Sequence, residues 1–152
     1  PCVMAANVKA EETGAPAAAM QMDDGTILTG KTSALLGASS ALLLNALKYI
    51  AGIDDKIELL SADLISPIQN LKVDHLGGHS SLLHLNEILI ALALASVTDP
   101  NAKKAIDQLD NLSGLEAHSS VILSQIDEGV FKKLGINLTC EPHYESKKLY
   151  HK

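Results

Sequence analysis

The sequence GTILTGKTSALLGASSALLLNALKYIAG, residues 25–52, decides the fold of this 152-residue chain. Its second half is apolar at nearly every position, so it predicts a helix that is buried on most sides. Thr32 or Ser33 is the expected N-cap, and Gly52 is the expected end of the helix. The helix is too short and too polar to span a membrane. We expect the rest of the chain to pack against it.

The same stretch contains the spacing G-x-x-x-x-G-K-T of a phosphate-binding loop, from Gly25 to Thr32. In such a loop backbone N–H groups surround the phosphates, the Lys reaches the terminal phosphate and the hydroxyl binds Mg²⁺. Here Asp23-Asp24-Gly25 is a hairpin-turn signal, and the residues between the glycines are β-branched or apolar. No apolar strand ending in Asp follows to hold magnesium. The sequence therefore favours a β-hairpin at 20–29 that leads into the helix, with an ATP-binding enzyme as the weaker alternative.

Composition narrows the classes of partner. The chain is 47% hydrophobic but only 3% aromatic, so part of its apolar surface is expected to be covered by something else. The formal net charge of −6 argues against a nucleic-acid or an anionic-membrane partner. All twelve basic residues are Lys, so the chain lacks the planar guanidinium that suits bidentate phosphate recognition.

Two cysteines, Cys2 and Cys140, lie far apart without a C-x-x-C motif, which indicates reduced thiols in a cytoplasmic protein. The beginning Pro1-Cys2-Val3 is neither a signal peptide nor an initiator, so we expect a part of a longer protein.

Strand and helix patterns alternate along the chain. We expect an N-terminal connector at 1–19, a single α/β domain at 20–142 and a polar C-terminal tail at 143–152. Pro67 is expected either to kink its helix or to open a second one. The predicted elements after the long helix are a strand at 56–61, a helix at 63–71, a histidine-rich loop, helices at 86–96 and 101–109, a strand at 116–123, a helix at 124–134 and a strand at 136–140.

This order predicts a three-layer α/β or α+β domain with a mixed sheet, because apolar helices alternate with strands and the first pair is an antiparallel hairpin.

The loop before the second apolar helix holds Asp74, His75, His79 and His84. The spacing of the histidines allows a metal site, but zinc needs convergent ligands and a second shell. A polar loop is the favoured interpretation, and no metal is predicted.

His118 and Ser119 lie in a predicted strand, and Ser124 follows it. Neighbouring residues of a strand point to opposite faces, so a nucleophilic Ser–His pair is disfavoured against a buried, hydrogen-bonded His118. Cys140 lies beside Glu141 without a reason for a lowered pKa, and we interpret it as structural.

Four segments together resemble a known family: TGKTSALLGASSALLLNALKYIAGIDD, PIQNLKVDHLG, EAHSSVILSQIDEGVFKKLGINLTCEP and KKLYHK. The family is the bacterial domain-of-unknown-function family 1846, and the resemblance covers nearly the whole chain. It implies the C-terminal domain of a longer protein, folded as an α/β three-layer αβα sandwich with a topology similar to the cytidine-deaminase-like group. Deaminase chemistry is not implied, because zinc binding there needs P-C-x-x-C and Pro1-Cys2 is followed by Val-Met-Ala. The resemblance implies no catalytic residue, and after VDHLG this chain departs from the family pattern.

The function predicted from these observations is a contribution to a cleft for a small anionic or nucleotide-like ligand, placed at the start of the long helix. The alternative is a non-catalytic domain that assembles into a homo-oligomer or docks the N-terminal region of its parent protein. No catalytic residue and no cofactor can be assigned. The candidate ligand-binding residues are Lys31, Thr32, Ser33, Asp74, His75, His118 and Ser119.

Overall fold

The computed structural model describes residues 1–33, 35–78 and 80–142, and its core is a four-stranded mixed sheet. The strands are β1 (Ala17–Gln21), β2 (Ile27–Lys31), β3 (Glu116–Ser119) and β4 (Asn137–Cys140), in the spatial order β2-β1-β3-β4. Strand β1 is antiparallel to both of its neighbours, while β3 and β4 are parallel. The predicted mixed sheet is confirmed.

The predicted hairpin is also confirmed, and it is longer than expected at both ends. Ala17 pairs with Lys31 and Gln21 with Ile27, with Gly25 in the turn at φ 88°. The interior of the phosphate-loop motif is therefore strand β2. The N–H groups of an extended strand point alternately to its two sides, so they cannot converge on a phosphate.

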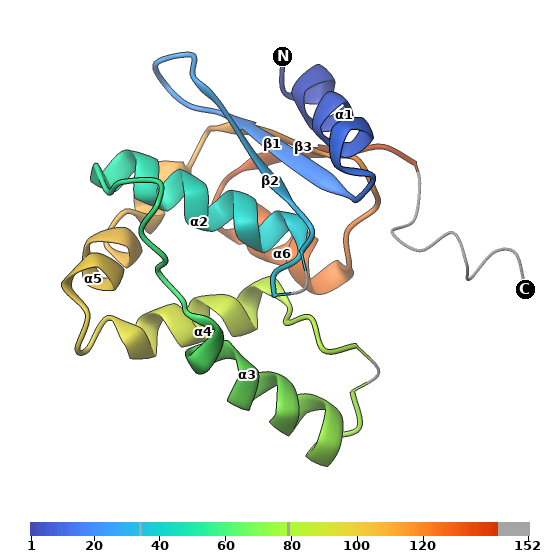
Figure 1. The fold of residues 1–152 in the computed structure, drawn as a ribbon. Helices are drawn as coiled ribbons and strands as arrows, with labels where there is room; N and C mark the ends of the chain where they lie inside the picture. The colour runs from blue at the N-terminus through green and yellow to red at the C-terminus, as the bar shows by residue number, and fades with distance from the viewer. Residues whose placement is uncertain (34, 79, 143–152) are drawn as a thin grey trace, which may run out of the picture.

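Helices cover both faces of the sheet, as Figure 1 shows. On one face lies α1 (Cys2–Thr13), where Cys2 and Ala6 pack with Ala19 of β1. On the other lie α2 (Ala38–Ala51) and α6 (Gln125–Lys133), whose buried residues form the main core with Met20 and Ala117. The weak structure expected for residues 1–19 is wrong, because the alanine-rich segment forms a helix that ends at Gly14 and then strand β1.

Helix α2 ends at Gly52 as predicted, with the glycine in the left-handed conformation at φ 73°. Its N-cap is Gly37, five residues after Thr32 and four after Ser33, and the helix begins at Ala38. The Ser33 hydroxyl accepts hydrogen bonds from the N–H groups of Leu35 and Leu36, so it closes a turn of its own. The Thr32 hydroxyl, upstream of this turn, accepts a hydrogen bond from the N–H of Ala38, the first residue of α2, at 3.2 Å.

The second glycine of the phosphate-loop motif is a packing residue. A Cβ at Gly30 would lie 2.8 Å from the Ala38 carbonyl oxygen and 2.8 Å from the Leu42 Cα. Strand β2 and helix α2 therefore approach so closely that only glycine fits between them.

The strand predicted at 56–61 is wrong. The segment contains turns, and the nearly buried Lys48 ammonium donates to the carbonyl oxygens of Asp55 and Ile57, at 2.9 and 3.1 Å. Those carbonyl groups are satisfied by a side chain and not by a neighbouring strand. Leu59 and Leu60 are still buried, which explains the apolar pattern.

The other helices follow their sequence signals closely. Helix α3 (Ala62–Asn70) contains Pro67 and continues without interruption into a π-helical turn, η1 (Leu71–His75). Three elements follow: α4 (Leu85–Ala95), α5 (Pro100–Ile106) with Asp99 as its N-cap, and the 3₁₀ turn η2 (Leu109–Leu112). Strand β3 is shorter than predicted, and α6 (Gln125–Lys133) lies within the predicted helix at 124–134, with Ser124 as its N-cap. Among the described residues, no helix combines the length and apolarity that crossing a membrane requires.

Candidate functional site

A cleft of about 410 Å³ lies at the carboxyl end of β3, where the chain turns toward α6. The carboxyl ends of strands are common positions for ligand sites in α/β proteins. The amino ends of three helices, α2, α4 and α6, open into the same cleft. Its walls include Pro16, Thr32, Gly37–Ser39, Lys72, His84, Val121–Ser124 and Asp127.

The carboxylate of Asp127 connects these three helices. It lies in the first turn of α6 and accepts hydrogen bonds from the Ser39 hydroxyl at 2.9 Å and from the backbone N–H of Leu85 at 2.8 Å. The amino end of a helix stabilises negative charge because its first N–H groups point outward. One acidic side chain therefore sits in the combined field of α2, α4 and α6.

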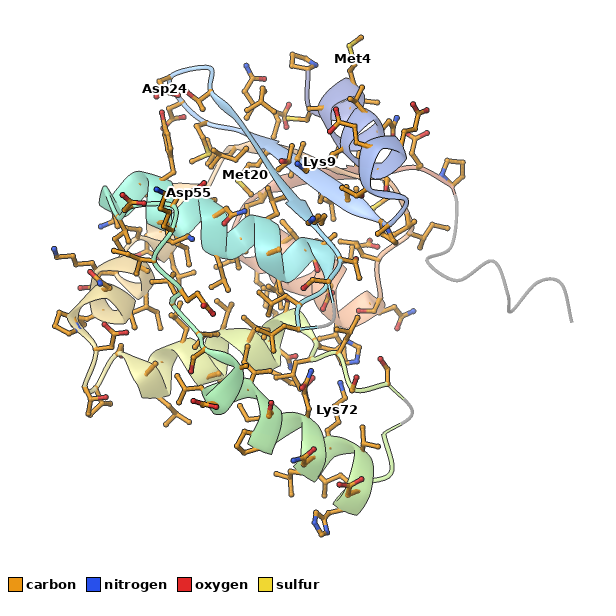
Figure 2. The ribbon with its side chains drawn as sticks, in the orientation of Figure 1. Met4, Lys9, Met20, Asp24, Asp55 and Lys72 are labelled. Carbon is orange, nitrogen blue, oxygen red and sulfur yellow. The ribbon has the colours of Figure 1, made fainter. Side chains whose placement is uncertain are left out.

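The ammonium group of Lys72 forms another wall of the cleft. Lys72 of η1 donates to the Leu82 carbonyl oxygen and to the Glu87 carboxylate, both at 2.9 Å (Figure 2). The same Glu87 oxygen accepts from the backbone N–H of His84 at 2.6 Å. Burial raises the pKa of Glu87, but the hydrogen bond from His84 and the charge of Lys72 outweigh it and lower the pKa. Glu87 is thus held as an anion that fixes both the start of α4 and the position of Lys72.

His84 contributes the imidazole of the cleft. Its Nδ1 lies 3.5 Å from the Ser124 hydroxyl oxygen and 3.7 Å from Oδ1 of Asp127. In a nucleophilic triad the hydroxyl and the carboxylate contact different ring nitrogens, whereas both face Nδ1 here. The Ser124 hydroxyl also accepts from the N–H of Asp127, as the cap of α6. The cluster is a hydrogen-bonding wall and lacks the geometry of a triad.

Of the residues predicted to bind ligand, Thr32 lines this cleft. Lys31 is exposed, and the pleat of β2 directs its side chain to the face opposite Gly30, away from α2. Ser33 is exposed in its own turn, and Asp74 and His75 are exposed on η1. His79 lies outside the described residues. In the described part of the chain, no group of three His, Cys, Asp or Glu residues is placed to hold a metal ion.

His118 and Ser119 lie next to the cleft in sequence but do not line it. The His118 side chain is only 4% exposed, and its ring nitrogens contact the Thr139 hydroxyl at 2.6 Å and the Glu141 carboxylate at 2.7 Å. The predicted buried, hydrogen-bonded histidine is confirmed. Its strand partner Ala19 belongs to the face covered by α1, while Ala18, the partner of Ser119, belongs to the main core.

Sequence reasoning missed Lys72, His84, Ser39 and Asp127 as members of one site. The pattern Ser124-x-x-Asp127 marks the start of a helix, and it could have identified Asp127 as a residue at an amino end. Nothing local connects that end with Lys72 or His84, because they meet only when α4 and η1 pack beside α6.

Comparison with known proteins identifies the family. Residues 1–150 match the family described as "Domain of unknown function DUF1846, C-terminal". The chain belongs to this family. The resemblance inferred from the sequence is thereby confirmed.

The curated relatives are bacterial and much longer than this chain. A UPF0371 protein of Corynebacterium efficiens is 55% identical over 141 residues, which are 93% of this chain and 28% of the relative. A UPF0371 protein of Corynebacterium aurimucosum is 52% identical over 153 residues, 100% of this chain and 31% of the relative. For a UPF0371 protein of Streptococcus thermophilus the identity is 50% over 150 residues, 99% of this chain and 30% of the relative. The chain thus corresponds to less than a third of each, as expected for one domain of a larger protein.

Proposed function

We propose that this domain supplies one side of a cleft that binds a small anionic or nucleotide-like ligand, within a larger protein. The observation that supports this most directly is the convergence of the amino ends of α2, α4 and α6 on one cleft. Its volume of about 410 Å³ falls in the range of small-molecule sites.

The position for the anionic group is the amino end of α2. In the part of the chain that the structure describes, no acceptor faces the N–H groups of Ser39 and Ser40 in its first turn. These groups and the Thr32 hydroxyl can donate to an oxyanion, as at other helix amino ends that bind phosphate. Since the chain has no arginine, backbone N–H groups, hydroxyls and Lys72 are the donors available to it.

The part of the cleft lined by His84 and Ser124 suits a neutral, polar part of the ligand. Asp127 and Glu87 are already hydrogen-bonded inside the protein, so they repel a second negative charge placed against them. His84 and Ser124 offer both donors and acceptors there. A ligand with one anionic end and one neutral, hydrogen-bonding end fits both sides.

The test is a thermal-shift screen of the purified chain with inorganic phosphate, sugar phosphates, nucleotides and divalent cations. A ligand at one hundred times its dissociation constant stabilises the folded state by about 2.7 kcal/mol, which raises the melting temperature visibly. We expect a phosphorylated compound to give this shift, and Lys72→Ala or Ser39→Ala to reduce it.

Each variant is compared with its own ligand-free melting temperature, because Lys72→Ala also removes an ion pair. Lys31→Ala is the matched control, with a lysine directed away from α2. A shift lost in Lys31→Ala and kept in Lys72→Ala and Ser39→Ala would contradict this site, as would no shift with any phosphorylated compound. Lys31, Ser33, Asp74, His75, His118 and Ser119 otherwise stay sequence predictions.

Assembly is the second candidate function, favoured by one apolar stripe on α4. Ile90 and Leu94 lie four residues apart on α4 and are 60% and 68% exposed, and Val97, in the turn after the helix, is 80% exposed. An exposed apolar face on α2 would favour assembly as well, but α2 buries nine of its fourteen residues. A homo-oligomer through α4 would be seen by light scattering, and Leu94→Asp should return it to the monomer.

We also propose the three-layer, cytidine-deaminase-like arrangement and a polar tail at residues 143–152, whereas α1 and β1 join residues 1–19 to the α/β domain. The helices on both faces of a mixed sheet support the first of these. The tail lies outside the described residues. A cytoplasmic location likewise stays a prediction.

A further inference from the structure

Helix α3, the turn η1 and Leu76 directly after it form an arm, residues 62–76. Most of its side chains are not buried in the domain. Of the nine residues of α3 only Ile65 is buried, and none of the five residues of η1 is buried. Figure 1 shows α3 at the edge of the molecule, away from the sheet. A helix that packs only within its own domain normally buries a whole face.

The outer side of this arm is apolar. Leu64 and Leu71 lie seven residues apart, two helical turns, and are 48% and 51% exposed. Leu76 follows η1 and is 72% exposed, and Val73, two positions after Leu71 and therefore on another side of the helical turn, is 38% exposed. Exposed leucines so close together mark an interaction surface more often than scattered single ones do.

We propose that this arm is the surface on which the rest of the longer polypeptide docks. The occupant follows from the relatives, in which roughly seventy per cent of the chain lies outside the matched region, as the coverage of 28% to 31% shows. Four exposed apolar side chains are few for an association of free partners, which typically buries about 800 Å² on each side. A tethered partner has an effective concentration in the millimolar range, so a smaller surface is enough. The remainder of the same polypeptide therefore fits better than a second copy of the domain.

Docking on the arm also brings that polypeptide to the cleft. Lys72 belongs to the arm and reaches the wall of the cleft through Leu82 and Glu87. A segment that covers Leu71 and Leu76 lies beside that wall. This inference does not depend on the proposed ligand, since the arm is exposed and apolar whatever the cleft binds.

The experiment compares hydrogen exchange in two proteins. One is this 152-residue chain, and the other is a chimaera in which it replaces the matched region of the Corynebacterium aurimucosum relative, 52% identical over the whole chain. We expect peptides from residues 62–76 to exchange at least about tenfold more slowly in the chimaera, at every protein concentration. Unchanged exchange in these peptides overturns the proposal. Protection that also develops in the short chain as its concentration rises indicates a second copy as the occupant and overturns it too.

Two substitutions of matched exposure separate docking from folding. Leu76 is 72% exposed on the arm and Met4 is 73% exposed on α1. In the chimaera, Leu76→Asp should remove the protection of residues 62–76, while Met4→Asp should leave it unchanged. In the short chain neither should change the melting temperature by more than a few degrees. Equal effects of both on the protection would exclude the arm as the docking surface.

Discussion

The carboxylate of Asp127 accepts a hydrogen bond from the backbone N–H of Leu85 at 2.8 Å, so a residue of α6 caps α4. Its other oxygen accepts from the Ser39 hydroxyl of α2 at 2.9 Å. Replacing Asp127 by Ala leaves these two donors without an acceptor. We expect the free energy of unfolding in urea to fall by about 1–3 kcal/mol.

Asp107→Ala is the control for this substitution. Asp107 pairs with Lys103 on the exposed side of α5, where an i, i+4 pair contributes about 0.3–0.5 kcal/mol. Equal losses in the two variants would mean that Asp127 does not hold the amino ends together.

Glu87 should make the stability depend on pH in the acid range. Burial alone would raise its pKa, but the hydrogen bond from His84 and the charge of Lys72 lower it below its ordinary value of 4.5. Because the folded state holds the carboxylate form more tightly, the contribution is complete above that ordinary value and is lost as the pH falls through the lowered pKa. The difference in unfolding free energy between the natural chain and Glu87→Gln should therefore shrink between about pH 5 and pH 3. A difference in unfolding free energy that grows as the pH falls would contradict a lowered pKa for Glu87 in the folded state.

The sequence predicts elements well where the signal is local. Gly52 was predicted to end α2 through its backbone conformation, and this is confirmed. Asp99 and Ser124 act within one turn in the same way, as the N-caps of α5 and α6, and both helices lie close to the predicted ranges. The predicted start of α2 was wrong because the N-cap is Gly37, and the hydroxyl that accepts from the Ala38 N–H belongs to Thr32, six residues upstream across a loop. The strand at 56–61 was wrong because a side chain from α2 satisfies its carbonyl groups.

Prediction from local sequence signals is even more limited for the candidate site. The sequence identified Thr32 as a candidate ligand-binding residue because it belongs to the phosphate-loop motif, although the interior of that motif forms strand β2. Lys72 and Asp127 are far apart in the chain and have no common pattern, so only the packing of η1 and α6 on α4 brings them to one cleft.

The two thiols should react slowly in the folded protein. Burial raises the pKa of both Cys2 and Cys140, and the nearby carboxylates of Glu116 and Glu128 raise them further. The thiolate is the reactive form, so labelling by a disulfide reagent at about pH 8 should be several-fold slower than in denaturant. Single Cys→Ala variants assign the two rates. A thiol that reacts as fast folded as unfolded would contradict this.

Lys48 should contribute more to the free energy of unfolding than a surface lysine does. It is only 8% exposed, and its ammonium donates to two carbonyl oxygens of the segment that follows α2. Lys48→Met keeps the apolar stem but leaves both carbonyl groups without a donor, which should cost about 1–3 kcal/mol in urea unfolding. Lys56→Met, in an exposed position of the same segment, should change stability by less than about 0.5 kcal/mol.

Gly30 separates the structural from the nucleotide-binding interpretation of the phosphate-loop motif. An Ala side chain there meets backbone atoms of Ala38 and Leu42, so β2 or α2 must move, and we expect a loss of about 1–3 kcal/mol or more. Gly129→Ala is a control of opposite sign, because that glycine lies inside α6 with no atom within 4 Å of the new methyl group. It should stabilise the protein by about 0.5–1 kcal/mol, the difference in helix propensity. If Gly30→Ala instead kept full stability and lost only the binding of a nucleotide, the motif would be a phosphate loop and the close packing of β2 on α2 would be wrong.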